Sequence, residues 1–181
     1  MPTAGTSTKS DERRRAIVAA AIECFAQKGL YGTTTHEIAD RVGVSQPYLY
    51  RLYSNKQALF AAAVDHVSVV MTETLTAQAP ASGEPLAPEA ELQAARDGYA
   101  ALVADRTILR FLMHANCAAG EPLVGQAVRG CYAKQVATVR QLLGDDDAVR
   151  SRFGAGMLDN VVAVLGLADI DEPWARVLTA Q

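Results

Sequence analysis

The chain has 181 residues, of which half are apolar and a fifth are charged, the composition of a globular protein with one domain or two small ones. No uncharged apolar run reaches the ~18 residues of a membrane-spanning helix, and the polar start MPTAGTSTKSDERRR lacks a secretory signal. We therefore expect a cytoplasmic protein without a membrane partner. Residues 1–60 hold eight Lys/Arg and five Asp/Glu, a net of +3, whereas residues 61–181 hold nine and fifteen, a net of −6, so only the N-terminal third suits a polyanionic partner.

Helical periodicity runs along almost the whole chain without a sustained alternation of apolar and polar residues, which predicts an all-α fold. Residues 1–10 are predicted to be a flexible polar arm, after which Ser10 is suited to cap a first helix. The apolar face of this helix is formed by Ile17, Ala20, Ala21, Cys24 and Phe25. The pair Lys28-Gly29 predicts its end, because a cation followed by glycine is typical of a helix stop.

Two short helices joined by a tight turn are predicted next, within residues 34–53. Thr34 stands three residues before Glu37, the spacing of a capping box at a helix start. The segment GVSQP (residues 43–47) then turns the chain and starts the next helix, with its serine or glutamine as the cap and its proline in the first turn. Two helices joined in this way indicate a helix-turn-helix, whose second helix enters the DNA major groove.

A longer helix is predicted over about residues 55–77, because Ser54 and Gln57 repeat the capping-box spacing. The stretch QAPASGEPLAPEA after it has three prolines and one glycine and is predicted to be a loop of roughly ten residues. Further helices are predicted over residues 88–104, 106–118, 122–143, 146–166 and 172–179.

The second helix of the short pair is unusually rich in polar aromatic side chains. Tyr48, Tyr50, Arg51 and Tyr53 fall within six residues, and such a helix is poorly suited to a core. We interpret this face as directed at DNA. The alternative is that the tyrosines form a protein interface, which would make the chain a helical adaptor.

Many spaced positions in this region fit one known pattern. They are Phe25-Ala26-x-Lys28-Gly29, Thr33-Thr34-Thr35, Ile38-Ala39, Gly43-Val44-Ser45, Leu49-Tyr50 and Asn55-Lys56-x-x-Leu59. With the stretch IVAAAIECFAQKGLYGTTTHEIADRVGVSQPYLYRLYSNKQALFAAAV that contains them, they resemble the DNA-binding domain of the tetracycline-repressor (TetR) family from about Arg14 to Val67. The rest of the chain is similar only in helical character and length.

The resemblance implies three parts: an arm over 1–10, a helix-turn-helix domain over 11–60, and a helical effector-binding and dimerisation domain over 61–181. It implies a transcriptional regulator, expected to be a repressor, that binds a palindromic operator as a homodimer and is released by a small-molecule effector. The operator half-sites would lie about one helical turn, ~34–36 Å, apart. An activator or a ligand-independent regulator with the same DNA site is the alternative.

The resemblance also implies roles for single residues. Gln46, Pro47 and Tyr48 would face base edges, since glutamine can pair with adenine and the other two can contact a thymine methyl group. The positions that resemble phosphate-binding ones are Thr35, Ser45, Tyr50, Tyr53 and Lys56. His36 and Arg51 are additional candidate contacts. Tyrosine 50 has the alternative of packing half in the core, and the arginines at 13–15 fit a solvated helix face as well as phosphate contacts.

Three predicted bundle helices carry polar or aromatic residues among apolar ones, the mixture that is typical of a ligand pocket. The candidate pocket residues are Arg96, Tyr99, Phe111, His114 and Tyr132. We expect an unknown, mainly apolar effector with one or two hydrogen-bonding groups, and no other cofactor. The alternative is that these polar groups reach solvent at the helix edges.

The predicted helix 146–166 has an apolar run near helical spacing, formed by Phe153, Met157, Val161 and Val164. Its stretch FGAGMLDNV is similar to the dimerising penultimate helix of many TetR-family members, and its two glycines would let another helix approach. We expect a two-fold dimer built from this helix and the last one. The alternative is that these residues fill the subunit's own core.

Neither catalysis nor metal binding is indicated. His36, His66 and His114 are far apart in the sequence, and no HExxH, GxSxG, Walker or GxGxxG pattern occurs, so we expect no enzyme and no catalytic or metal-ligating residue. The three cysteines lack metal-ligand spacing and are expected to be free thiols. We expect them to act as small apolar side chains, with redox sensing by Cys117 or Cys131 as the alternative.

Overall fold

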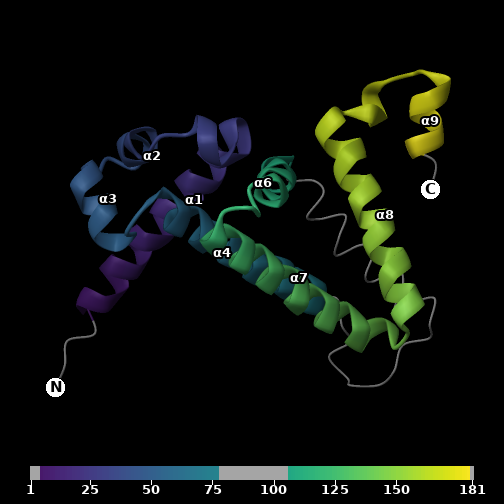
Figure 1. Cartoon of the computed structure of the whole chain (residues 1–181), viewed down its shortest axis with the longest axis horizontal. Coiled ribbons are helices and arrows are strands. Elements are labelled where there is room, and N and C mark those ends of the chain that lie inside the picture. Colours follow the sequence, from purple (N-terminus) through teal and green to yellow (C-terminus); the bar gives the residue numbers. More distant parts are fainter. Residues whose placement is uncertain (1–4, 78–105, 180–181) are drawn as a thin grey trace. The chain divides into compact units, whose positions relative to one another are not determined.

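The computed structural model describes residues 5–77 and 106–179 (Figure 1). Its elements are α1 (Gly5–Gly32), α2 (Thr35–Arg41), α3 (Gln46–Leu52), α4 (Lys56–Ala77), α6 (Arg106–Cys117), α7 (Pro122–Leu143), α8 (Asp146–Leu165), the short 3-10 helix η1 (Leu167–Asp169) and α9 (Pro173–Thr179). Neither range contains a strand, which confirms the all-α class. The predicted linker and the predicted helix 88–104 fall outside the described residues.

The chain forms two compact units. The first comprises Met1–Val67 and Phe111–Gly130, and so holds α1, α2 and α3 with parts of α4, α6 and α7. The second comprises Ser68–Arg110 and Cys131–Gln181, with the remaining parts of these helices and all of α8, η1 and α9. The first unit is thus larger than the segment 11–60, because residues of α6 and α7 pack with it.

A row of three phenylalanines lies at the centre of the first unit. Phe60 of α4 stands between Phe25 of α1 and Phe111 of α6, with ring-centroid distances of 4.6 and 5.0 Å. All three side chains are fully buried. The same unit buries Ile17, Leu30, Ile38, Leu49, Leu59, Val64 and Val67. Three helices distant in sequence are therefore joined through one aromatic row, whose burial is the main stabilising contribution expected of such side chains.

The start of α1 differs from the prediction. The helix begins at Gly5, so residues 5–10, predicted as part of a flexible arm, are helical. No proline or glycine interrupts residues 6–28. Once the core-facing part of a helix has formed, each preceding residue extends it at little cost, and this explains why the helix continues beyond Ser10.

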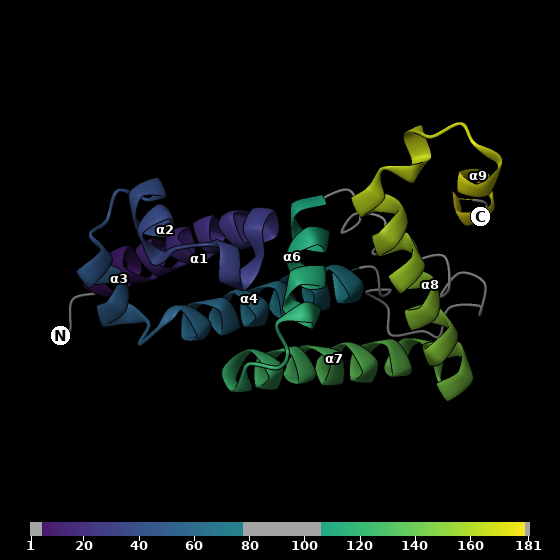
Figure 2. The same cartoon turned by 45° about the horizontal axis from the view of Figure 1, so that its top comes forward.

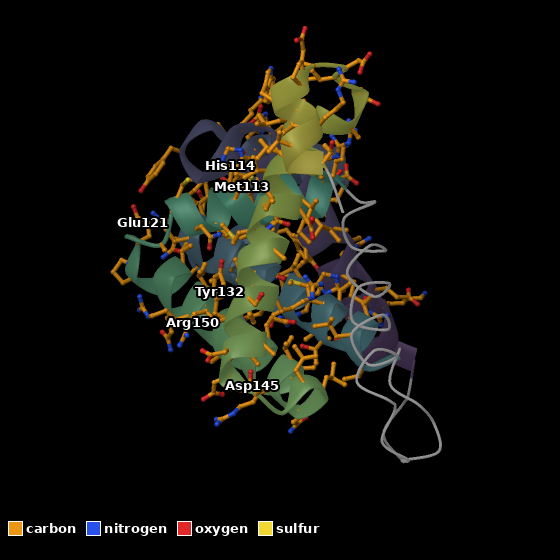
Figure 3. All side chains as sticks on the ribbon, turned by 90° about the vertical axis from the view of Figure 1, so that its right-hand side faces the viewer. Met113, His114, Glu121, Tyr132, Asp145 and Arg150 are labelled. Carbon is orange, nitrogen blue, oxygen red and sulfur yellow. The ribbon has the colours of Figure 1, made fainter. Side chains whose placement is uncertain are left out.

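The predicted end of α1 is a kink. Gly29 has φ 67°, ψ −175°, and the chain makes a further turn before it leaves the helix at Gly32. A Cβ atom at Gly29 would lie 2.8 Å from Nδ1 of His114 in α6. Nearby, the Tyr31 hydroxyl donates to a carboxylate oxygen of Glu121 at 2.9 Å (Figure 3 labels His114 and Glu121). The kink therefore fits closely against the end of α6 and the turn that follows it.

The two short helices lie beside α1 (Figure 2) and begin as predicted. Thr34 caps α2 and forms the capping box with Glu37. The hydroxyl of Ser45 caps α3 by accepting the N–H of Tyr48 at 3.3 Å, and Pro47 lies in the first turn. Because these capping contacts join residues within one turn of helix, the sequence alone predicts them.

The prediction that Ser54 and Gln57 form a capping box at the start of α4 is wrong, because Asn55 is the residue that caps this helix. The side-chain oxygen of Asn55 accepts the N–H of Ala58 at 2.7 Å, and α4 begins at Lys56. Asparagine is as good a cap as serine, so the helix starts one residue later than the pair Ser54 and Gln57 indicated.

The second unit has a smaller apolar core. Leu75 of α4, Val139 of α7 and Val149 of α8 are buried together, and Leu143 and Phe153 pack against them. The junction between α7 and α8 is as predicted. Glycine 144 turns the chain with φ 68°, and the carboxylate of aspartate 145 accepts the N–H of alanine 148 at 2.7 Å at the start of α8.

One helix in the described ranges, Lys56–Thr76 of α4, is long and apolar enough to cross a membrane by length and composition. Core helices of globular proteins pass the same test. Phe60, Val64 and Val67 of this helix are buried inside the first unit, so α4 already has a role as a core helix.

Candidate nucleic-acid interface

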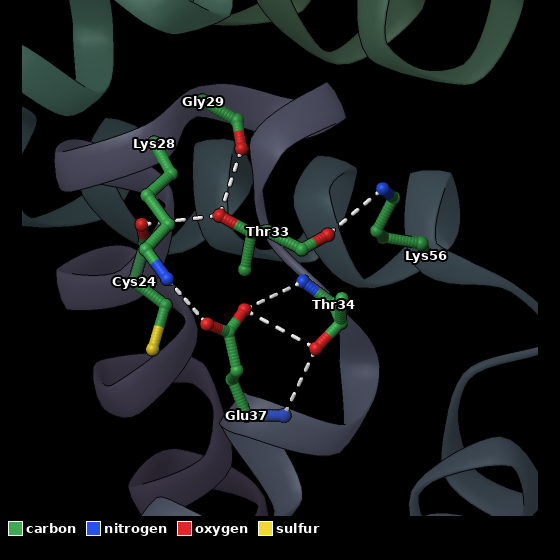
Figure 4. A network of polar contacts seen from close by, with 7 residues as sticks. All are labelled: Cys24, Lys28, Gly29, Thr33, Thr34, Glu37 and Lys56. Atoms are coloured by element: carbon green, nitrogen blue, oxygen red, sulfur yellow. Dashed lines mark hydrogen bonds and ion pairs between the residues drawn. The ribbon is translucent and has the colours of Figure 1, made fainter.

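A polar network holds α2 against α1 (Figure 4). Lys28 of α1 forms a hydrogen-bonded ion pair with Glu37 of α2, whose other carboxylate oxygen accepts the backbone N–H of Thr34 at 2.9 Å. The pKa of Glu37 is lowered to about 2. The largest cause is the hydrogen bond from Lys28, and the next is the one from the backbone N–H of Thr34. A second ion pair joins Arg41 to Glu23. Both pairs are exposed, so they orient α2 more than they stabilise the fold.

The turn before α2 is also fixed to α4 (Figure 4). Thr33 is buried, and its hydroxyl lies 2.8 Å from the carbonyl oxygen of Gly29 and 3.1 Å from that of Cys24. Its own carbonyl oxygen accepts from the Lys56 amino group at 2.9 Å. Lys56, predicted to bind phosphate, thus uses one of its three N–H groups within the protein and retains two for another acceptor.

Helix α3 presents its polar side chains outward. Ser45, Pro47, Tyr50 and Arg51 are exposed, whereas Gln46 is half-buried. Leucine 49 of the same helix is fully buried. Several of the positions predicted to contact DNA are therefore exposed on α3 or at its start, and α3 is anchored by its single fully buried leucine.

Two arginines flank the aromatic ring of Tyr48. The guanidinium carbon of Arg51 lies 4.8 Å from the ring centroid, and that of Arg13 lies 5.9 Å from it. Both distances are within the range of cation–π attraction. Arg13 belongs to α1, 35 positions earlier in the chain, and the sequence left open whether it contacts a polyanion. The structure brings its positive charge to the start of α3.

Thr35, Gln46 and Tyr50 share one hydrogen-bonded group. Oγ1 of Thr35 accepts from Nε2 of Gln46 at 2.7 Å and lies 3.1 Å from the hydroxyl of Tyr50. Thr35 is only 5% exposed, so its hydroxyl lies inside the contact between α2 and α3. Of the ten positions predicted to contact DNA, Thr35 is the one whose polar atom is covered by neighbouring residues.

Two further predicted positions lie at the edges of this face. His36 is exposed on α2, and its Nε2 lies 3.2 Å from a carboxylate oxygen of Asp40. Tyr53 ends α3, and its N–H donates to the carbonyl oxygen of Leu49 at 2.9 Å. Burial of the Tyr53 ring raises the pKa of its hydroxyl, against a lowering by Arg14. A protonated hydroxyl remains a hydrogen-bond donor.

Residues 17–63, which contain this interface, match the family model described as bacterial regulatory proteins, tetR family. This segment is therefore similar to the DNA-binding domain of TetR-family regulators. Over 58 residues it is 43% identical to the HTH-type transcriptional activator FasR of Mycolicibacterium smegmatis, a match that covers 32% of this chain and 26% of FasR. Over 74 residues it is 34% identical to the HTH-type transcriptional repressor Rv3405c of Mycobacterium tuberculosis, covering 41% and 39%. Both matches span well under half of these curated relatives.

A solved structure extends the likeness in fold to nearly the whole chain. The transcriptional regulator FadR of Bacillus subtilis, in complex with stearoyl-CoA, superimposes with a TM-score of 0.68 over 92% of this chain and 94% of FadR. Sequence identity is 16%, so the comparison concerns the fold alone.

The residues predicted to line an effector pocket fall in different parts of the chain. Arg96 and Tyr99 lie outside the described residues. Phe111 is fully buried in the aromatic row of the first unit, and His114 of the same unit lies against the kink of α1. Tyr132 belongs to the second unit, where its ring centroid is 6.1 Å from that of phenylalanine 153.

The second unit also contains a buried polar group, Gln135, which the sequence offers as one of the polar residues of the predicted helix 122–143. Nε2 of Gln135 in α7 donates to the carbonyl oxygen of Ser68 at 3.2 Å and to the hydroxyl of Thr72 at 3.0 Å, both in α4. Within the described parts of the chain, Oε1 of Gln135 and Oγ of Ser68 are buried without a hydrogen-bond partner. A serine in a helix gives no periodicity signal that would reveal such a contact.

The positions predicted to form a dimer differ in exposure. Met157 is 43% exposed, whereas Phe153, Val161 and Val164 are half-buried. Further exposed apolar side chains of α8 and α9 are Leu158, Leu165, Trp174 and Val177. No group of three or more His, Cys, Asp or Glu side chains that could hold a metal ion occurs in the ranges 5–77 and 106–179.

Proposed function

We propose that this chain is a cytoplasmic transcriptional regulator that binds a palindromic operator as a homodimer, acts as a repressor and is released by a small-molecule effector. The observation that carries the DNA-binding part is the outer face of α3. It combines a capped helix N-terminus, the amide of Gln46, and the ring of Tyr48 with the guanidinium groups of Arg13 and Arg51 near it. The amide of Gln46 and the ring of Tyr48 suit base edges, whereas the helix N-terminus and the two arginines suit phosphates. The net positive charge of residues 1–60 supports the same partner.

The proposed direction of regulation, repression, rests on a simple mechanism. A dimer whose two α3 helices occupy successive major grooves would block access to a promoter. The relatives named above include an activator and a repressor, so an activator with the same DNA site is the alternative function. A repressor and an activator are distinguished by measuring transcription of a reporter gene placed behind the operator, with and without the protein.

The proposed dimer is supported by the apolar surface of the second unit. Met157 of α8, Trp174 of α9 and Val177 of α9 are 43%, 53% and 75% exposed. Exposed apolar groups that lie together favour a protein contact, and a two-fold contact would match two operator half-sites. The half-buried Phe153, Val161 and Val164 would extend this contact.

A small-molecule effector is supported by the buried polar atoms of Ser68 and Gln135, since such atoms need a hydrogen-bond partner. An effector with a donor group for Oε1 of Gln135 would supply the missing partner. FadR of Bacillus subtilis, which has the same fold, binds stearoyl-CoA. The effector would shift DNA affinity only by binding the free and DNA-bound conformations unequally.

The DNA interface is tested with two variants. Tyr48→Ala should lower the preference for operator over random DNA by about 1–3 kcal/mol, because it removes a base contact. Lys56→Ala should weaken both kinds of DNA alike and reduce the salt slope by about one, because it removes a phosphate contact. Fluorescence anisotropy at several salt concentrations measures both effects.

The thermal midpoint of each variant serves as the control, since Lys56 also bonds the Thr33 carbonyl. A Tyr48→Ala protein that keeps the full specificity ratio would remove this residue from base recognition. Affinity that does not fall with salt for any variant would favour the helical adaptor over a DNA-binding protein.

The proposed dimer is tested by Met157→Arg. A charged group in an apolar contact would be left without water or a partner, so we expect a folded monomer at concentrations where the unchanged protein is a dimer. Light scattering measures the mass, and Ala155→Arg, at an exposed position on the opposite side of the same helix, is the matched control. A folded Met157→Arg protein that stays dimeric would show that α8 uses another face or none.

A further inference from the structure

Thr35 is the first residue of α2, yet its side chain belongs to the contact with α3. It is 5% exposed. Its Oγ1 lies 2.7 Å from Nε2 of Gln46 and 3.1 Å from the hydroxyl of Tyr50. Gln46 and Tyr50 are four positions apart in α3, so they stand on the same face of that helix. One buried hydroxyl therefore contacts two side chains of the face proposed to meet DNA.

The chemistry of the three groups limits the direction of these hydrogen bonds. An amide nitrogen only donates, so Oγ1 of Thr35 accepts from Gln46. In the contact between Thr35 and Tyr50 either hydroxyl can donate. When Thr35 donates, the hydrogen bonds run from Gln46 through Thr35 to Tyr50, and each hydroxyl hydrogen has a separate use. The hydroxyl hydrogen of Tyr50 then points outward as a donor.

This arrangement limits what α3 presents to a partner. The amide of Gln46 is planar, with a donor on one side and an acceptor on the other. While Thr35 accepts from Nε2 and donates to Tyr50, an amide rotated by 180° would place its oxygen against a hydroxyl whose hydrogen is already used, so the observed orientation of Gln46 is favoured. The free N–H and Oε1 of Gln46 then keep fixed places, as bidentate pairing with adenine requires. Tyr50 is likewise left as a donor, the form that a phosphate oxygen accepts.

We propose that Thr35 is a positioning residue that sets the base preference of this protein through Gln46. Its hydroxyl orients the amide of Gln46 and the hydroxyl of Tyr50, and it does not itself contact DNA. The inference rests on the proposed DNA-binding function. It assigns Thr35 a part in specificity instead of the direct phosphate contact that the family resemblance implies, because its oxygen is already enclosed by α3.

The test is selection of bound DNA from a random pool by the full chain and three variants. Gln46→Ala should remove the preference at one base pair in each half-site. Thr35→Val, which keeps the shape and loses the hydroxyl, should reduce the preference at that same base pair by roughly 5- to 10-fold, the scale of one lost base contact. Preferences at all other positions should stay unchanged. Thr35→Ser, which keeps the hydroxyl, should retain the unchanged pattern.

A merely structural role for Thr35 would weaken binding to all sequences alike, so an unchanged pattern with Thr35→Val would overturn the inference. Gln46→Ala without effect at any position would overturn it as well, since Thr35 is inferred to act through Gln46. A wild-type chain that enriches no sequence would instead overturn the proposed function, and the inference with it. If thermal unfolding shows Thr35→Val to be unfolded, Thr35→Ala replaces it, with the same expected pattern.

Discussion

Phe60→Ala is expected to lower the free energy of unfolding by about 3–5 kcal/mol, the usual cost of truncating a buried phenylalanine. Phe60 is fully buried and contacts Phe25 on one side and Phe111 on the other, at ring-centroid distances of 4.6 and 5.0 Å. Its removal would leave a cavity between α1, α4 and α6 that the two remaining rings cannot fill. Guanidinium unfolding followed by circular dichroism at a fixed protein concentration measures the loss.

The matched control is Val69→Ala in the same helix. Val69 is 47% exposed, and truncating an exposed side chain usually changes stability by less than about 0.5 kcal/mol. A loss for Phe60→Ala no larger than that for Val69→Ala would mean that the aromatic row does not stabilise the first unit. Alanine at position 60 should also weaken DNA binding, because α4 would lose its main contact with α1.

Gly125→Ala is expected to destabilise the protein by about 1–3 kcal/mol or more through overpacking. An added Cβ would lie 2.3 Å from the carbonyl oxygen of Ala119, a backbone atom that cannot move aside as a side-chain end can. The N–H of Gly125 donates to the carbonyl oxygen of Glu121 at 2.7 Å, so the turn between α6 and α7 is folded tightly onto the first turn of α7. Thermal and guanidinium unfolding measure the effect.

Gly130→Ala in the same helix provides the control, because nothing lies within 4 Å of its added Cβ. The substitution there should stabilise the protein by about 0.5–1 kcal/mol, since alanine favours a helix over glycine. The two variants should therefore shift the midpoint of unfolding in opposite directions. Equal shifts would show that the turn before α7 can relax without cost.

The sequence by itself determined the helices and most of their boundaries. The capping box of Thr34 and Glu37, the serine cap of α3 and the aspartate at the start of α8 are contacts between residues three positions apart. Such signals are complete within one turn of helix, and a sequence pattern contains them in full. The prediction that α3 faces DNA rests on the same kind of local information, because the characteristic positions of the family pattern are closely spaced in the sequence.

Only the tertiary structure decided which helices meet and which polar groups share a hydrogen bond. Arg13 reaches Tyr48 from α1, Thr35 is enclosed by α3, and Gln135 reaches across to α4. Position 125 requires glycine because of a turn that no helical pattern describes.

Periodicity tells which face of a helix is apolar, but two helices with apolar faces can pack in many registers and at several crossing angles. The register is selected by the fit of particular side chains, such as the aromatic row of Phe25, Phe60 and Phe111. Tight packing makes that choice sensitive to single methylene groups. For this reason the helices could be read from the sequence, whereas the surroundings of Thr35 required the fold.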